Sequence, residues 1–518
     1  MLVAAGALEA GLHITAEQLG RAATVAELAS VAIIAPTPGA SREPGQEAEA
    51  GPVPFTPRLH YYFSDTGQHS RGGIECVSFD AREPIDAGLL EDALHAVVAR
   101  HDALRLRFAP GPSGNQAHTV LHEDHRLVET IHSESLSESA RQAAVSEVTA
   151  AMRGGIDLEE GPLVRLVLLK QGTCRPDHLV LFVHHVAFDA YSEAIILEDL
   201  EAAYRCLVHG QPPRWPVMAT SFRRWAEHLK EHAQAKTTEE QLDSWLESPW
   251  PKARRLRIDR QGIARPTGRV RTLKGRLESD PTRALLRDVP RVLDARVPDV
   301  LVAALAQALA GWTKKSRPVL IGLITHGREP LSPDVDVSRT VGWFTSSCPV
   351  VIEVTGTNAA ELLPSVREQV HKAGARSLRY DLLRYLCDDE RIAARIRRIP
   401  KPRIDVNYLG QVDEMDRRRS LFVRAQNLPD TGLPPQTSVP TFETLRLKAH
   451  VQQGRLHLAL RYHENAYRRK TMKRLLRALV EAVHEIISVC AWESGRLSRA
   501  EIQSADDADS AGKRVPVA

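Results

Sequence analysis

A pair of adjacent histidines, His184 and His185, with Asp189 and Ser192 shortly after them, is the part of the sequence best suited to proton chemistry. An imidazole is the side chain that most readily takes up and releases a proton near neutral pH. The pair follows the apolar run 179–183, which predicts a buried strand, and Asp and Ser are residue types that begin helices. Because side chains alternate along a strand, at most one of the two histidines faces a cleft. The alternative for a single histidine in such a place is an ordinary core residue.

The elements that must position these residues are a strand and the helix after it. Downstream of Asp189, apolar residues recur at helical spacing up to Gly210. A second unit has the reverse order: Pro298 and Asp299 begin a helix, and the apolar run 319–324 predicts a strand. Helical periods alternating with short apolar runs predict an α/β fold.

Composition excludes several classes of protein. The 518 residues suffice for two to four domains, and no apolar run reaches the roughly 18 residues of a spanning helix. We therefore expect no membrane insertion, and because Lys and Arg (68) nearly balance Asp and Glu (65), we also expect no nucleic-acid partner. The six cysteines form no C-x-x-C pair, which argues against a metal site and against a disulfide framework. These features, and an N-terminus without a basic signal-peptide region, predict a cytoplasmic protein.

Changes in amino-acid composition along the chain predict five segments. Residues 1–34 have two helix-start patterns, and the proline-rich stretch 35–52 is typical of a linker. We then expect an N-terminal lobe over 53–245 and a C-terminal lobe over 246–490, with the connection between lobes at its start. Residues 491–518, small and polar at their end, are expected to form a disordered tail.

The pattern HHxxxDxxS at 184–192 resembles the signature of the condensation superfamily of nonribosomal peptide synthetases. Other segments, in the family's order, are similar to the core motifs of its epimerization branch, and the resemblance covers roughly 53–490. The segments are Arg100 to Arg105, Thr220 to Trp225, Val337 to Thr345, Tyr380 to Tyr385 and Asn407 to Gln411. The runs SRTVGWFT and NYLGQ distinguish this branch from ordinary condensation domains.

The resemblance implies two lobes that are each similar to chloramphenicol acetyltransferase and form a V-shaped pseudo-dimer with a central tunnel. A carrier protein, in cis or in trans, would bring the substrate into that tunnel on its phosphopantetheine arm. The implied partners are this peptidyl or aminoacyl carrier protein and other synthetase modules of antibiotic or secondary metabolism. No cofactor or metal bound directly by the chain is implied.

The implied activity is that of an isomerase, which removes the α-proton of a carrier-bound aminoacyl or peptidyl thioester and returns one from the other face. By resemblance His185 is one proton carrier, His184 packs inside its lobe and Asp189 holds the loop in shape. The residues expected to support the site are His184, Asp189, Ser192, Thr325, His326, Arg328, Glu329, Trp343, Asn407 and Tyr408.

The chain departs from the family at the second proton carrier. The family's E-G-H-G-R-E motif aligns with 324–329, so Ile324 holds the position of the first Glu and Thr325 that of the first Gly. An aliphatic side chain has no proton to give. Glu329 and Tyr408 are the alternative groups. A weakened epimerase, a non-catalytic structural or gating module, and a carrier-dependent condensation or acyl-transfer enzyme that uses His185 alone therefore all stay open.

Smaller departures concern Ala190, where the family has Gly, and Glu193, where it has Trp. Residues 1–34 resemble the last helices of a carrier protein without the serine that would bear phosphopantetheine; the alternative is a helical leader with no function of its own. Nothing in the sequence identifies the amino acid or the length of the peptide.

Overall fold

The computed structural model contains two compact units, and each is described by itself. The first comprises Met1–Gln234, Arg328–Thr345 and Glu414–Pro440, and the second Ala235–Gly327, Ser346–Asp413 and Thr441–Ala518. The described residues are 12–13, 29, 33–34, 50–65, 73–111, 114–121, 125–173, 175–215, 218, 220–234, 242–246, 250, 253, 256, 258–259, 270–313, 318–329, 331–332, 335–356, 358–412, 420–425 and 445–493.

The units do not follow the simple order that the sequence predicts. Two segments of the expected C-terminal lobe, 328–345 and 414–440, belong to the first unit, so the chain passes between the units more than once. No local pattern indicates this, because membership of a unit depends on contacts between residues far apart in the sequence.

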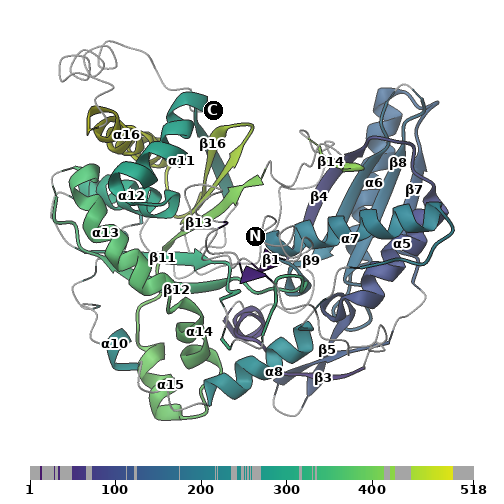
Figure 1. Ribbon diagram of the computed structural model, residues 1–518, viewed down its shortest axis with the longest axis horizontal. Helices are drawn as coiled ribbons and strands as arrows, with labels where there is room; N and C mark the ends of the chain where they lie inside the picture. Colours follow the sequence, from purple (N-terminus) through teal and green to yellow (C-terminus); the bar gives the residue numbers. More distant parts are fainter. Residues whose placement is uncertain are drawn as a thin grey trace. The chain divides into compact units, whose positions relative to one another are not determined.

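The first unit is built on a five-stranded sheet in the order β14-β4-β9-β8-β7 (Figure 1). All neighbours pair antiparallel except β7 and β8. The central strand β9 is buried along its whole length, as its apolar run predicts. The strands are β4 (Ile74–Ala81), β7 (Val128–His132), β8 (Val164–Lys170), β9 (His178–His184) and β14 (Phe422–Arg424).

Helices and a smaller sheet complete the first unit. The small sheet has the order β3-β6-β5, from Gly51–Val53, Gly114–Thr119 and Leu106–Gly111. The helices are α4 (Pro57–His60), α5 (Ala87–Arg100), α6 (Glu138–Gly154), α7 (Ala190–Val208) and α8 (Phe222–Ala233). Side-chain caps begin most of them, among them Asp189 at α7 and Ser221 at α8.

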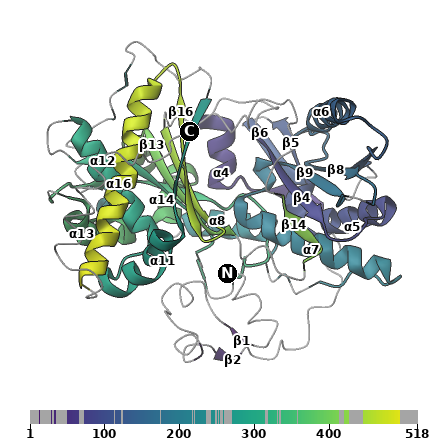
Figure 2. The ribbon, with the colours of Figure 1, turned by 90° about the horizontal axis from the view of Figure 1, so that it is seen from above.

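The second unit has a six-stranded sheet in the order β10-β16-β15-β13-β11-β12. Its strands are β10 (Val270–Leu277), β11 (Val319–Thr325), β12 (Ser346–Ile352), β13 (Ile404–Gln411), β15 (Leu445–Gln452) and β16 (Arg455–His463). Helices α12, α13 and α16 lie along one face of this sheet (Figure 2). The helices are α10 (Leu242–Leu246), α11 (Ser279–Leu293), α12 (Val297–Thr313), α13 (Ala359–Gly374), α14 (Ser377–Tyr385), α15 (Glu390–Arg397) and α16 (Arg469–Glu493).

The two strand and helix pairs expected from the sequence are both confirmed. Strand β9 is followed by α7, and α12 is followed by β11. Of residues 1–34, the structure describes little beyond Leu12–His13 and Ile33–Ile34, which pair as strands β1 and β2, so the expected helices lie outside the described residues. Most of the expected linker and tail also lie outside the described residues. Helix α16 continues to Glu493, so the first three residues of the expected disordered tail, 491–493, are helical. Within the described ranges, no helix has both the length and the apolar character that crossing a membrane requires.

Candidate functional site

His185 is held by one hydrogen bond and one aromatic contact. Its Nδ1 lies 2.6 Å from the carbonyl oxygen of Phe188. A carbonyl can only accept, so Nδ1 carries the proton and Nε2 of the neutral ring keeps its lone pair. The indole of Trp343 stacks on the imidazole with ring centroids 4.3 Å apart and planes 21° apart. Half-buried and fixed in this way, His185 presents a basic nitrogen in a defined orientation.

His184 has a different environment, because it ends β9 and is 0% exposed. Its Nδ1 accepts a hydrogen bond of 3.2 Å from the backbone N of Val186. Its Nε2 lies 3.5 Å from the hydroxyl of Tyr62, whose ring meets it edge to face. Both ring nitrogens thus have partners inside the unit. His184 is placed as expected for a packing residue.

Asp189 joins two segments of the first unit. It caps α7 through Oδ1, which accepts hydrogen bonds of 2.8 Å from the backbone N and from the hydroxyl of Ser192. Its Oδ2 accepts one of 3.1 Å from the backbone N of Phe344. A carboxylate with both oxygens engaged by donors is held in one orientation and fixes the loop around it. Asp189 therefore has the geometry of a residue that holds its loop in shape.

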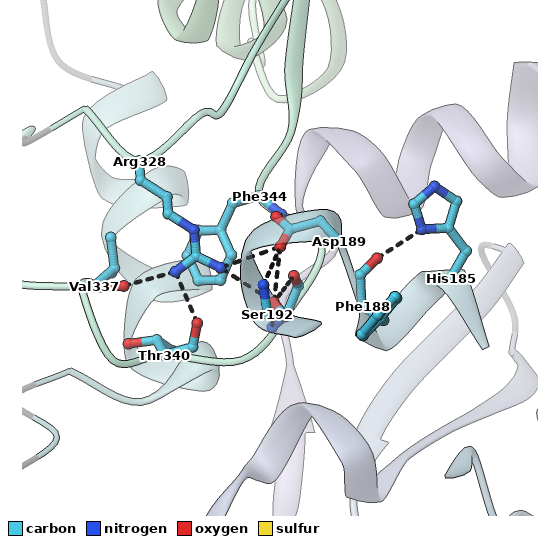
Figure 3. Close-up of polar contacts among 9 residues, drawn as sticks. His185, Phe188, Asp189, Ser192, Arg328, Val337, Thr340 and Phe344 are labelled. Carbon is cyan, nitrogen blue, oxygen red and sulfur yellow. Dashed lines mark hydrogen bonds and ion pairs between the residues drawn. The ribbon is translucent and has the colours of Figure 1, made fainter. Parts of the chain in front are cut away.

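Arg328 lies beside Asp189 (Figure 3), and its side chain is buried. Its Nη1 donates to the carbonyl oxygens of Val337 (2.7 Å) and Thr340 (2.8 Å). Its Nη2 lies 3.2 Å from Ser192 Oγ and 3.4 Å from Asp189 Oδ1. Burial lowers the pKa of this guanidinium, and the negative charge of Asp189 opposes that shift.

Two aromatic rings enclose the guanidinium of Arg328. Its central carbon is 4.3 Å from the ring centroid of Tyr191 and 3.9 Å from that of Phe344. Cation–π contacts of this kind offset part of the cost of burying a charge. Together with its hydrogen bonds, they make Arg328 the centre of the loop 337–344, which carries Trp343 to His185.

A second ion-pair cluster holds the same loop on α7. Arg339 donates to Glu198 Oε2 at 2.6 Å and also contacts Asp199 Oδ1. The other oxygen of Asp199 accepts from Arg100 Nε and from His101 Nε2, both at 2.9 Å. Sequence reasoning placed Arg100 and His101 in a family motif but did not assign them this role, since their partner is about a hundred residues away.

In the second unit, Ile324 lies in β11 and is half-buried. β11 pairs in parallel with β13, where Gly322 is opposite Asp405 and Leu323 opposite Val406. Continuing this register by one residue sets Ile324 beside Asn407. Since side chains two apart share a face, both lie on the face that carries Asp405. The position of the family Glu, Ile324, and the Asn of NYLGQ, Asn407, therefore lie side by side on one face of the sheet.

Thr325 and Tyr408 are on the opposite face of that sheet, towards the helices. The hydroxyl of Thr325 lies 2.7 Å from that of Ser377, the first residue of α14. Tyr408 packs against the main core of the second unit. The expected site residues of this unit are therefore divided between two faces, and Tyr408 does not share the face of Ile324. Ser377 is a partner that sequence reasoning missed.

The E-G-H-G-R-E-like motif is divided between the two units after Gly327, which has a positive φ of 67°. His326 is exposed and belongs to the second unit, whereas Arg328 and Glu329 belong to the first. Glu329 is half-buried, and its Oε2 has no hydrogen-bond partner within the described part of the chain.

Glu193, which replaces the family's Trp, forms an ion pair with Arg424 of β14. β14 pairs antiparallel with β4, with Phe422 opposite Ala81. The substitution thus connects α7 to a strand that arrives from the far end of the sequence. Burial lowers the pKa of Arg424.

Comparison with known proteins agrees with this geometry. The model of the condensation domain family matches residues 52–506. The chain belongs to the condensation domain family. One of the subunits of linear gramicidin synthase from Brevibacillus parabrevis is 34% identical over 497 residues, which are 94% of this chain and 9% of that protein. Another of its subunits is 32% identical over 492 residues, which cover 93% of this chain and 6% of that protein. This condensation-family chain therefore spans less than a tenth of either relative.

Solved structures of the family have the same fold. The epimerization domain from the third module of tyrocidine synthetase B superimposes with a TM-score of 0.77 at 26% identity, covering 88% of this chain and 100% of that one. The X-domain from teicoplanin biosynthesis has a TM-score of 0.65 at 20% identity, with coverages of 86% and 96%, and shows the fold alone. The resemblance inferred from the motifs is confirmed: this condensation-family domain is similar to an epimerization domain and shares the chloramphenicol acetyltransferase-like α/β fold.

Proposed function

We propose that the domain is of the epimerization type and acts on the α-carbon of an aminoacyl or peptidyl thioester held by a carrier protein. The observation that supports this most is the state of His185, whose Nδ1 is bound to the Phe188 carbonyl and whose Nε2 keeps its lone pair. The similarity to a tyrocidine synthetase epimerization domain points in the same direction.

In the proposed reaction, Nε2 of His185 takes the α-proton, which the neighbouring thioester carbonyl makes acidic. The C–H electron pair moves into the enolate, and the imidazole becomes an imidazolium. The other ring proton stays on Nδ1, which continues to donate to the Phe188 carbonyl, and Trp343 limits rotation of the ring. Inversion then requires a proton from the other face of the enolate. A positioned acid contributes about 10²–10⁴-fold to such a step, and Ile324 cannot supply it.

The substrate would arrive on a phosphopantetheine arm, which belongs to the carrier and not to this chain. The more similar of the two gramicidin synthase relatives matches 94% of the chain, more than residues 52–518 contain, so the match continues into the residues before the condensation domain. This continuation takes in most of the expected linker before the domain, and the similarity to synthetase subunits supports a carrier protein and neighbouring synthetase modules as the partners.

Mass spectrometry in heavy water tests the proposal. A carrier protein loaded with an aminoacyl or dipeptidyl thioester is incubated with the chain, and uptake of one deuterium at the α-carbon is followed over time. We expect slow uptake that requires His185, together with loss of stereochemical purity. Uptake equal to that of the loaded carrier alone would contradict the proposal.

A specific observation favours a second candidate, a non-catalytic structural or gating module. Ile324 removes the acid from the last but one position of a well-formed strand, while the loop contacts of Asp189 and Arg328 are all present. Such a module would bind the loaded carrier and exchange no α-proton. Condensation or acyl transfer, in which His185 activates an amine or a hydroxyl, requires no second acid; new amide or ester product from two loaded carriers would identify it.

A further inference from the structure

Trp343 is enclosed by three aromatic side chains of the first unit. One face of its indole stacks on the imidazole of His185. The rings of Tyr61 and Tyr62 each meet it nearly edge to face, with centroids 6.4 Å away and planes at 81° and 73°. These separations lie within the range in which aromatic pairs attract each other. Because Trp343 is only 6% exposed, its indole cannot turn unless a neighbouring ring moves.

Two of these rings belong to a short helical segment that also contains Arg58. Helix α4 is continued by a wider helical turn, Tyr61–Asp65. Residues three and four positions apart on a helix are neighbours, so Arg58 lies beside both Tyr61 and Tyr62. The central carbon of its guanidinium is 5.3 Å from the ring centroid of Tyr61, which is a cation–π contact. Arg58 therefore holds one of the rings that border Trp343.

Arg58 also holds the backbone next to Trp343. Its Nε donates a hydrogen bond to the carbonyl oxygen of Thr345. A charged donor makes a stronger hydrogen bond than a neutral donor does. Ser192 and Asp189 bind the backbone immediately before and after Trp343, and Arg58 extends these contacts by one residue. The backbone that carries the indole is thus fixed on both sides.

The burial of Arg58 is costly for the fold. Arg58 is 7% exposed, and withdrawing a guanidinium from water carries a penalty that an aliphatic side chain of similar length avoids. Filling space is therefore a poor explanation for an arginine at this position. Its two contacts, with the ring of Tyr61 and the carbonyl of Thr345, both require the guanidinium and both lead to Trp343.

We propose that Arg58 is a positioning residue for proton transfer by His185. In this inference, which rests on the proposed function, Arg58 acts through its neighbours. It keeps Tyr61 and the Thr345 carbonyl in place, and these keep Trp343 stacked on the imidazole. The stack fixes the plane of the ring, and so the direction in which Nε2 is presented. A reacting group displaced by about 1 Å can slow a reaction about 10²-fold.

NMR of the histidine rings tests the positioning without turnover. The intact chain is labelled with ring-carbon-13 histidine, and His185→Asn identifies the signal of His185. A stacked indole moves the ring protons of an imidazole upfield, and Trp343→Leu gives the position of the unstacked signal. We expect Arg58→Met to move the His185 signal most of the way to that position, because Met fills the space without a donor or a charge. Arg58→Lys keeps both and should leave the signal near its parent position.

A second variant and a matched control complete the NMR test. Tyr61→Leu removes the ring that Arg58 covers and should move the signal in the same direction, so the test stands even if Arg58→Met does not fold. The control is Arg82→Met, because the Nε of Arg82 also donates to a distant carbonyl of the first unit, that of Ser420 at 2.9 Å. Arg82 follows the end of β4 remote from the strand position that pairs with His184, so this variant should leave the signal unchanged.

Exchange of the α-proton is the second measurement. At saturating loaded carrier, Arg58→Met should slow deuterium uptake about tenfold with an unchanged half-saturating concentration, and Arg58→Lys should restore most of the rate. A His185 signal at its parent position in both Arg58→Met and Tyr61→Leu would overturn the inference. So would an equal displacement in Arg82→Met, which would indicate a general loss of structure. A displaced signal in Arg58→Met, with no uptake in any variant or in the parent, would contradict the proposed isomerase and leave the positioning role standing.

Discussion

The carbonyl oxygen of Phe188 accepts a hydrogen bond from Nδ1 of His185 at 2.6 Å, and this one contact determines which nitrogen of the imidazole can act as a base. It comes from the short helical turn His185–Ala187, which brings the carbonyl back to the ring three residues earlier. The local backbone therefore orients the side chain.

An asparagine at this position separates orientation from basicity. In His185→Asn the side-chain amide can still donate to the Phe188 carbonyl, but the nitrogen corresponding to Nε2 is absent. We expect a melting temperature close to that of the parent and a loss of α-proton exchange of about 10²-fold or more. The comparison is best made in an Ile324→Glu background, where exchange is expected to be fastest. Undiminished exchange would show that His185 is not the base.

Removing Arg328 should destabilise the first unit strongly. Arg328→Met keeps much of the side-chain volume between Tyr191 and Phe344, but leaves Asp189 without its buried cation and two carbonyls without donors. The expected loss is about 3 kcal/mol in the free energy of unfolding, measured by urea denaturation. Arg391→Met is the control, because the pair of Arg391 and Asp389 is exposed and should contribute less than about 1 kcal/mol.

Restoring a carboxylate at Ile324 tests the missing proton carrier. If the proposed function holds, Ile324→Glu should increase deuterium uptake at the α-carbon by about 10²-fold or more, the usual contribution of one positioned acid or base. Ile324→Gln has the same size without the acid and should give no increase. Fast uptake in the parent chain that neither variant alters would direct attention to Glu329, whose Oε2 is buried.

Local patterns in the sequence were sufficient to predict β9, α7, α12 and β11. An apolar run and a helical period depend on neighbouring residues only, so they can be recognised without knowledge of the fold. The motifs also indicated His185, Asp189 and Arg328, and a single fully buried histidine was expected from strand alternation.

Long-range relationships could not be predicted in the same way. The pairing of β14 with β4, the ion pair of Glu193 with Arg424 and the hydroxyl contact of Thr325 with Ser377 each join distant segments. Strand β15 shows the same limit: its alternation of apolar and polar residues is visible in the sequence, but its place between β13 and β16 is not.

The buried cluster around Asp199 should make stability depend on pH. Burial lowers the pKa of His101, and Asp199 opposes this only in part because Arg100 and Arg339 also neutralise that carboxylate. The folded protein then keeps the imidazole neutral at a pH where the unfolded chain protonates it, below about 6.5. The unfolded state binds more protons there, so stability decreases as the pH decreases.

His101→Gln removes this titration and retains a donor for Asp199. Between pH 7.5 and pH 5.5 the parent should lose on the order of 1 kcal/mol more stability than the variant, measured by urea denaturation at both values. Replacing His132, whose side chain is 73% exposed, by Gln serves as the control and should leave the pH dependence of the parent unchanged. A His101→Gln variant as sensitive to acid as the parent would exclude His101 as the cause.

The last prediction concerns the attachment of β14. In Glu193→Gln the side chain keeps its size but loses its charge, so Arg424 loses its ionic partner. The hydrogen bond between the Ser420 hydroxyl and Glu201 and the pairing of β14 with β4 are unaffected, so the unit should stay folded and lose about 1 kcal/mol. The effect should be local: backbone amides of Phe422–Arg424 should exchange with deuterium about fivefold faster, while those of β8 and β9 are unchanged. Glu227→Gln, on a partly exposed face of α8, is the matched control. If β14 exchanged at the same rate in both variants, the ion pair would not be what holds this strand against α7.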